Sequence, residues 1–399
     1  MRRLPPICVV GGGIMGLAVA RDLALRGLPC LLVERGQLGG ETTTHCVGHL
    51  HSGARYAVAS RDVAARCLAA QREICAVAGF AVSGKEGLFV SLDTHPAGSS
   101  EAFATACCES GIPIRWLGRS AALALEPRLG PRVLGAFLTP DRRVNPYALV
   151  ESHRECLRAL GVTVRAHCRL VRADRRPAGA WEVHLADRGG RRAVVVAGGI
   201  VNAAGPWAPE VSAACGATLD AVRIQGGSVV LEHALCSRVV SSCTARRVGD
   251  VAIPSGRRTL VGSTWKVVAS GRAETVAAED VDAMLTTASA VLPAVRQARV
   301  LRTYSGVRLQ IPGEPTDGRP YGLVPDVGVV EHVEQGERSG LVTAVLGKLT
   351  LFNHGARAVV DALLRQQGLD IPSRTHEIPL PVPHFSGRQL AHAREVQRV

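Results

Sequence analysis

The chain has 399 residues, of which 47% are hydrophobic and 20% charged, and its net charge is +13. This length and composition exclude a mainly disordered chain and indicate either two closely packed domains or one large domain with a cap. The basic residues are mostly arginines scattered along the chain, and no basic run is interleaved with aromatic residues. We therefore expect no nucleic-acid partner. The positive charge is still compatible with an anionic substrate or with loose attraction to an acidic membrane surface.

The N-terminal residues predict a dinucleotide-binding β–α–β unit. The apolar residues 7–10 run directly into a glycine-rich turn in which Gly11, Gly13 and Gly16 satisfy G-x-G-x-x-G. This spacing allows a tight turn, close approach of the backbone to a pyrophosphate, and close packing of a helix on the strand. A helix over 17–26 and a strand over 31–33 follow, and Glu34 stands where an acid can accept hydrogen bonds from an adenosine ribose.

The N-terminus also imitates a secretory signal, since two arginines precede an apolar run that ends in Ala-Val-Ala. The consecutive glycines and the second strand favour the nucleotide fold, so we expect an unprocessed chain. Twelve cysteines occur without regular spacing or a C-x-x-C pair, which predicts reduced, mostly buried thiols in a cytoplasmic protein. No apolar stretch of about 20 residues is present to span a bilayer; contact with the inner membrane face stays open.

The polar, glycine-rich segment 40–56 follows the β–α–β unit. Its hydroxyls and backbone N–H groups could extend a phosphate cradle toward a reactive ring. His45, Cys46, His49 and His51 could be read as a metal cluster, but they are borderline ligands on a loop with no companion cluster, and we predict no metal.

Further motifs follow along the chain, and with the N-terminal unit they resemble the FAD-dependent glycerol-3-phosphate dehydrogenases, particularly the catalytic subunit of the anaerobic enzyme. They are HLHSGARYAV at 49–58, EGLFV at 86–90, LEP at 125–127, TPD at 139–141, NPY at 145–147, VNAAGPW at 201–207, YSGVR at 304–308 and LGKLT at 346–350. The resemblance runs from about residue 7 to residue 365. It implies an α/β flavoprotein of the D-amino-acid-oxidase-like superfamily, with FAD as cofactor.

On that fold we expect a Rossmann-like, glutathione-reductase-like FAD-binding domain and a discontinuous α+β substrate domain. The FAD-binding domain would comprise 1–79, 143–215 and 300–370, the substrate domain 80–142 and 216–299, and an extended surface tail 371–399. Helices are predicted at 62–78, 101–110 and 147–160, and strands at 162–164, 194–196, 199–202, 227–231 and 259–264.

The resemblance implies a set of FAD contacts. They are Gly11, Gly13, Ile14, Met15, Gly16, Glu34, Arg35, Thr42, Thr43, Thr44, Gly48, His49, Ala203, Gly205, Trp207, Gly347, Lys348, Leu349 and Thr350. The strand ending in Ala203 to Gly205 would supply the second FAD contact of the family; the alternative is a small-residue turn after any buried strand.

The catalytic candidates are Arg308, His51, Tyr56, Arg55 and Lys348. An arginine presents a planar fork suited to a carboxylate or phosphate, but each arginine could instead be an ion-paired structural residue. Lys348 would stabilise negative charge on the reduced ring or bind substrate. His51 and Tyr56 are the proton-handling types, and a neutral imidazole suits general-base work near neutral pH.

The substrate-binding set is expected to comprise Arg55, Tyr56, Arg308 and Arg319. The chain departs from the family at two places. Gly226 replaces a lysine usual in the family, and residues 351–353 replace threonine, tyrosine and arginine. These changes weaken the assignment of glycerol 3-phosphate itself.

We therefore predict an FAD-dependent dehydrogenase or oxidase that takes a hydride from a small anionic CH–OH substrate, with glycerol 3-phosphate as first candidate and dihydroxyacetone phosphate as its product. The alternative is a 2-hydroxyacid or amino-acid/amine oxidase in which Arg308 binds a carboxylate. A rival of another class is a flavin-bearing electron-transfer subunit or an RNA-acting flavoprotein. The sequence stops before the cysteine-rich C-terminal domain of the anaerobic enzyme, so electrons are expected to pass to a quinone, oxygen or a partner protein.

Overall fold

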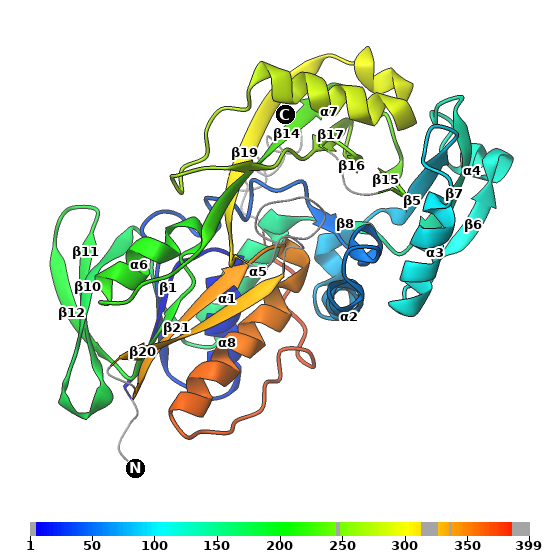
Figure 1. Cartoon of the computed structure of the whole chain (residues 1–399). Helices are drawn as coiled ribbons and strands as arrows, with labels where there is room; N and C mark the ends of the chain where they lie inside the picture. The colour runs from blue at the N-terminus through cyan, green and yellow to red at the C-terminus, as the bar shows by residue number, and fades with distance from the viewer. Residues whose placement is uncertain (1–4, 245–247, 313–325, 335–336, 385–399) are drawn as a thin grey trace.

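The computed structural model describes residues 5–244, 248–312, 326–334 and 337–384. Its elements form two large β-sheets, one in the lower half and one in the upper half of Figure 1. Two long neighbouring strands, β14 (Val222–Leu231) and β19 (Val300–Gln310), reach from the upper sheet toward the lower one. The space between the sheets is therefore bordered by elements from both.

The lower sheet has six strands in the order β20-β21-β13-β1-β2-β9. All neighbouring pairs are parallel except β20 and β21, which are antiparallel. The strands are β1 (Ile7–Val10), β2 (Cys30–Val33), β9 (Thr163–Arg165), β13 (Gly199–Asn202), β20 (Val327–Glu334) and β21 (Glu337–Leu346). The carboxyl ends of β1, β2 and β13 thus lie side by side, at the edge where open parallel sheets bind ligands.

Both faces of the lower sheet are covered, which explains why β1 is apolar at every position. Ile7 and Val9 pack against the helices of one face, whereas Cys8 and Val10 belong to the core on the other face. The first face carries α1 (Ile14–Leu25), α5 (Pro146–Ala159) and α8 (Phe352–Gln366). The second carries a three-stranded sheet of β10 (Cys168–Arg175), β11 (Trp181–Asp187) and β12 (Arg192–Ala197), together with α6 (Ala208–Ala214).

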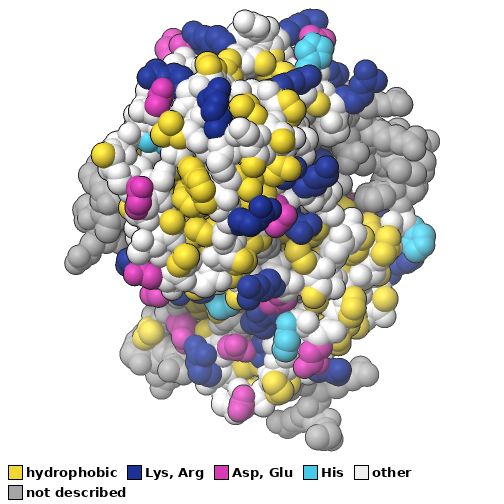
Figure 2. All heavy atoms as spheres, turned by 90° about the vertical axis from the view of Figure 1, so that its right-hand side faces the viewer, with side chains coloured by type: hydrophobic (Ala, Val, Ile, Leu, Met, Phe, Trp, Pro, Cys, Tyr) yellow, Lys and Arg dark blue, Asp and Glu magenta, His cyan; other side chains and the backbone are white. Residues whose placement is uncertain are grey.

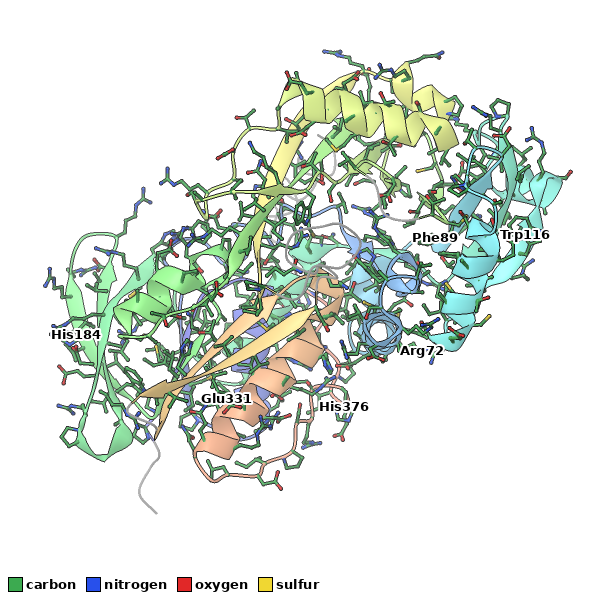
Figure 3. All side chains as sticks on the ribbon, in the orientation of Figure 1. Arg72, Phe89, Trp116, His184, Glu331 and His376 are labelled. Carbon is green, nitrogen blue, oxygen red and sulfur yellow. The ribbon has the colours of Figure 1, made fainter. Side chains whose placement is uncertain are left out.

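The upper sheet has nine strands in the order β18-β14-β17-β16-β15-β5-β7-β6, and β19 also pairs with β14. The strands not yet given are β5 (Lys85–Leu92), β6 (Arg115–Gly118), β7 (Val133–Thr139), β15 (Arg238–Ser242), β16 (Val251–Ser255), β17 (Arg258–Gly262) and β18 (Lys266–Val267). Helix α7 (Ala278–Val291) packs on this sheet through Met284 and Ala288. Phe89, which is labelled in Figure 3, lies on the opposite face. Its ring stacks on that of Phe103 of α3 (Ser99–Glu109), with ring centroids 5.1 Å apart.

A small sheet and one long helix place residues 49–56. β3 (His49–Leu50), β8 (Arg142–Val144) and β4 (Val82–Ser83) form this sheet. Helix α2 (Arg61–Val77) begins after Ser60, whose hydroxyl accepts a hydrogen bond from the N–H of Val63. A short helix, α4 (Arg119–Leu125), packs beside β6 and β7.

The helices predicted at 62–78, 101–110 and 147–160 correspond to α2, α3 and α5 with ends that differ by at most two residues. Helix α1 begins at Ile14 instead of the predicted residue 17, because the glycine turn is shorter than expected. The strand expected over 259–264 is β17, which ends at Gly262. The domain boundaries stay a prediction; β19, which that division assigns to the FAD-binding domain, pairs with β14 along its length.

The segment after α8 lacks helices and strands over its described residues, and part of it is packed against the core. Leu380 is only 4% exposed and belongs to the core around α1, α5 and α8. Its N–H donates to the carbonyl of Val77 at 2.7 Å. The buried guanidinium of Arg21 donates to the carbonyl of Thr375 at 3.4 Å, so the segment is tied to α1. His376 of the same segment is exposed on the outside (Figure 3).

The surface seen in Figure 2 has basic, acidic and apolar side chains interspersed, without one continuous basic area on that face. Among the described helices, none combines the length and apolar character needed to cross a membrane. All twelve cysteines are free thiols, and most of them are buried.

Candidate functional site

A cavity of about 830 Å³ lies where the carboxyl ends of β1, β2 and β13 face β14 and β19. Its volume lies within the range of small-molecule and cofactor sites, which runs to about 1,000 Å³. Its lining includes the glycine turn, most of segment 40–56, residues 203–207 and the loop after β21. Residues far apart in the sequence thus converge on one site.

The glycine turn at the end of β1 has no room for a side chain at Gly11 or Gly16. Gly11 has φ +112°, and a Cβ there would lie 2.4 Å from the carbonyl oxygen of Ala203. A Cβ on Gly16 would lie 1.8 Å from the carbonyl oxygen of Gly11, so Gly16 serves the packing of α1 and does not line the cavity. At Gly13 a Cβ would approach only the hydroxyl of Thr43, at 3.3 Å. The backbone at Gly13 is therefore open to the cavity at the start of α1, as a phosphate site requires.

The end of the cavity beside β2 carries polar and aromatic groups. The carboxylate of Glu34 accepts hydrogen bonds from the N–H groups of Gly12 and Gly36, each at 2.6 Å. The guanidinium of Arg35 lies over the ring of Trp207, 3.5 Å from its centroid. Residues 168–171 of β10 line the same end of the cavity. They were not predicted, because the sequence of this strand contains no motif that indicates contact with a cofactor.

The other end of the cavity brings together the five catalytic candidates. Arg308 comes from β19, Lys348 from the loop after β21, His51 from the residue after β3, and Arg55 and Tyr56 from the short helix Ala54–Tyr56. Gly53 makes this turn possible, since it has φ +99° and a Cβ would lie 2.2 Å from the carbonyl oxygen of Ala64.

Aromatic and hydroxyl contacts hold His51, Tyr56 and Lys348 together. The hydroxyl of Tyr56 lies 3.3 Å from Nε2 of His51. The ammonium of Lys348 lies 3.5 Å from the centroid of the Tyr56 ring and 3.7 Å from Sγ of Cys67. The N–H of His51 donates to the hydroxyl of Thr350 at 3.1 Å, so Thr350 orients the histidine backbone and does not line the cavity.

The two arginines among the catalytic candidates, Arg55 and Arg308, differ in their surroundings. Arg55 forms a buried ion pair with Asp250 and donates to the hydroxyl of Ser241 at 3.3 Å. Burial alone would lower the pKa of Arg55, but Asp250 outweighs it and leaves the pKa raised. Burial lowers the pKa of Arg308, and its Nε is buried without a hydrogen-bond partner among the described residues.

Asp141 is a fully buried carboxylate beside this group of residues. It accepts hydrogen bonds from Nε2 of His49 at 2.7 Å, from the N–H and hydroxyl of Ser52, and from the hydroxyl of Thr139 at 2.9 Å. Burial would raise the pKa of Asp141, but these donors, His49 first, outweigh it and leave the pKa lowered. Asp141 is therefore ionised at neutral pH.

One further predicted FAD contact, Thr44, lies away from the cavity lining. The hydroxyl of Thr44 donates to the carbonyl of Gly39 at 2.7 Å, and Thr44 does not line the cavity. Arg319 lies outside the described residues. Apart from Gly16, Thr44 and Thr350, the predicted FAD contacts all line the cavity.

Comparisons with known proteins identify the family of the chain. The model of the family described as FAD dependent oxidoreductase matches residues 6–351. A subunit of the anaerobic glycerol-3-phosphate dehydrogenase of Escherichia coli K12 is 29% identical over 383 residues, which cover 94% of this chain and 70% of that protein. Glycine oxidase of Geobacillus kaustophilus is 26% identical over 328 residues, covering 79% of this chain and 83% of that protein.

Solved structures give the same fold. A crystal structure of glycine oxidase from Geobacillus kaustophilus has a TM-score of 0.73 at 22% identity, covering 96% of this chain and all of that one. Glycerol-3-phosphate dehydrogenase from Bacillus halodurans, complexed with FAD, has a TM-score of 0.70 at 19% identity and covers all of this chain and 75% of that one. The predicted α/β flavoprotein fold is confirmed. The chain belongs to the FAD-dependent oxidoreductase family, and its cofactor is FAD.

Proposed function

We propose that this protein oxidises the CH–OH group of a small anionic substrate, with glycerol 3-phosphate as the first candidate. The observation that carries the proposal is the guanidinium of Arg308, whose buried Nε has no hydrogen-bond partner among the described residues and which lines the same cavity as the glycine turn. A cation whose buried N–H group has no partner favours an anionic ligand. The similarity to subunits of glycerol-3-phosphate dehydrogenases supports a phosphate ester as that ligand.

The residues of the β1–α1 end fit FAD. The open backbone at Gly13 and the start of α1 would hold the pyrophosphate, and Glu34 would accept hydrogen bonds from the ribose. The stacked pair of Arg35 and Trp207 would border the adenine end. FAD, when bound, supplies a hydride acceptor.

The residues at the other end of the cavity would bind the substrate, accept its proton and stabilise negative charge. Arg308 would bind the substrate's anionic group through its planar fork and hold the reacting carbon in place. His51 would take the proton of the substrate hydroxyl. Lys348, held over the Tyr56 ring, would stabilise negative charge that develops during the reaction.

A carboxylate substrate is the second candidate, and the ion pair of Arg55 with Asp250 favours it. The guanidinium of Arg55 is already neutralised by Asp250, and Gly226 supplies no cation where the related dehydrogenases usually have one. The single carboxylate of a 2-hydroxyacid or amino acid needs less positive charge than a phosphate dianion. The similarity to glycine oxidases is consistent with this alternative.

Anaerobic titration of the FAD-loaded protein tests both candidates. We expect glycerol 3-phosphate to bleach the flavin absorbance, and neutral glycerol to bleach it far more slowly. Bleaching by 2-hydroxyacids or amino acids, without an effect of phosphate esters, would establish the second candidate. Reduction by no member of the panel until a partner protein is added would favour an electron-transfer role.

A further inference from the structure

Asp141 and His49 form a buried pair directly behind the proposed general base. His49 is 4% exposed and Asp141 is not exposed at all. The 2.7 Å hydrogen bond between them turns Nε2 of His49 toward the carboxylate. His49 lies on β3 of the small sheet. Asp141 is the residue just before β8, the strand that pairs with β3.

The His49 ring lies against the His51 ring. Their centroids are 3.8 Å apart, and the ring planes are tilted by 38°. One nitrogen of each histidine and one oxygen of Asp141 all lie within 4.8 Å of one another. His51 also contacts Tyr56, whose hydroxyl is 3.3 Å from Nε2. The proposed base is therefore held between a second imidazole and a phenol.

We propose that Asp141 and His49 are positioning residues for His51: the carboxylate fixes the His49 ring, and the ring and the buried charge together hold His51 and stabilise its protonated form. This inference rests on the proposed role of His51. In that role the substrate O–H bond breaks, an N–H bond forms on the imidazole, and the imidazole gains one positive charge. A fixed anion within 4.8 Å stabilises that charge.

The charges around His51 show why such an anion is needed. Lys348 lies over the Tyr56 ring, and Arg308 and Arg55 line the same part of the cavity. Asp250 already pairs with Arg55. Without Asp141, the cations facing His51 would favour its neutral form so strongly that it would be a weak base.

The hydrogen bonding of Asp141 is more than packing requires. Three residues donate to it, and Ser52 does so through both its N–H and its hydroxyl. These donors keep the carboxylate charged inside the protein. If Asp141 served only to fill space, an apolar side chain of similar volume could stand there without loss of folding stability.

Histidine NMR of the FAD-loaded protein tests the inference without a substrate. The His51 resonance is identified by its loss in His51→Gln. In Asp141→Asn, which keeps the shape and an acceptor for His49, we expect the His51 titration to move about one pH unit lower, as loss of one nearby buried charge predicts. The matched control is Asp282→Asn, which removes an equal charge from the exposed surface of α7 and should leave the titration unchanged.

A second variant separates orientation from charge. His49→Gln keeps a donor for Asp141 but lacks the ring, so we expect the His51 resonance to broaden or split while the pKa shift is smaller than in Asp141→Asn. An unchanged His51 titration in Asp141→Asn would overturn the inference, as would stoichiometric zinc that is lost in His49→Gln. The NMR titration needs no turnover. If no candidate substrate reduced the flavin, the proposed function would be refuted, but the measured effect of Asp141 on the His51 titration would still hold. With an active substrate, the acidic limb of kcat/KM should move by the same amount.

Discussion

Arg55 donates to a carboxylate oxygen of Asp250 in an ion pair whose side chains are only 11% and 2% exposed. Arg308, in the same cavity, has a buried Nε without a partner among the described residues. The two guanidinium groups therefore differ in the attraction that they offer to an anion, because a paired arginine is already neutralised. Arg308 is the one that we expect to contact the anionic group of the substrate.

Removing the charge of Asp250 should strengthen anion binding. Asp250→Asn keeps an acceptor for Arg55 but removes one negative charge from the edge of the cavity, so inorganic phosphate should bind about tenfold more tightly, a change of about 1.4 kcal/mol. The measurement is flavin fluorescence quenching by phosphate. The control is Ser241→Ala, which removes the other partner of Arg55 without a change of charge. Equal phosphate affinity in the two variants would contradict the explanation.

Substitution of Arg308 should slow the reduction of the flavin by substrate and spare cofactor binding. Arg308→Met removes the charge and the fork, and we expect kcat/KM to fall by roughly 10³-fold or more, whereas Arg308→Lys keeps the charge and should lose roughly 10-fold to 100-fold. Stopped-flow flavin reduction gives the rates, and the absorbance ratio of flavin to protein gives FAD content. If the flavin of Arg308→Met were reduced as fast as that of the parent protein, the anionic group would have to bind elsewhere.

A methyl group on Gly11 should prevent FAD binding. In Gly11→Ala the new Cβ would lie 2.4 Å from the carbonyl oxygen of Ala203 at φ +112°. We expect a colourless protein whose FAD affinity is weaker by about 100-fold or more, because a shift of the turn would close the phosphate site. Gly27→Ala is the matched control, because Gly27 also has positive φ (+76°) but nothing lies within 4 Å of its Cβ position. A yellow Gly11→Ala protein would show that this turn does not face the cofactor.

These residues also show how far the sequence alone leads. The glycine turn could be predicted because its requirements are local: Gly11 and Gly16 are five positions apart and contact each other directly. The pairing of Arg55 with Asp250 joins residues 195 positions apart, and that of His49 with Asp141 joins residues 92 positions apart. No spacing rule predicts such contacts, because they depend on which distant segments the fold brings side by side. The same holds for Leu380, whose burial depends on α1, α5 and α8.

The segment after α8 should contribute to stability through Leu380. Leu380→Asp places a charge in the core at a position 4% exposed, and we expect a loss of about 3 kcal/mol or more. Val382→Asp introduces the same group two residues later at a position 65% exposed and should change stability by less than about 0.5 kcal/mol. Thermal unfolding of the FAD-loaded proteins gives the comparison. Equal melting temperatures in the two variants would mean that the segment does not pack as described.

The fully buried His153 should make the protein less stable in mild acid. Burial, with a smaller effect of Arg21, lowers the pKa of His153 from 6.5 to about 3. Between these values the unfolded chain binds a proton that the folded protein does not, so stability falls as the pH drops below 6.5. At about 1.4 kcal/mol per pH unit, this one group removes about 2 kcal/mol at pH 5.

His153→Met should lose that part of the pH dependence, because it has no titrating group at this position. Urea unfolding at pH 7 and pH 5 measures the difference between the two midpoints. His376→Met is the control, since His376 is exposed and should leave the difference between the two pH values as it is in the parent protein. A His153→Met protein that still lost as much stability between pH 7 and pH 5 as the parent would show that acid sensitivity arises at other groups.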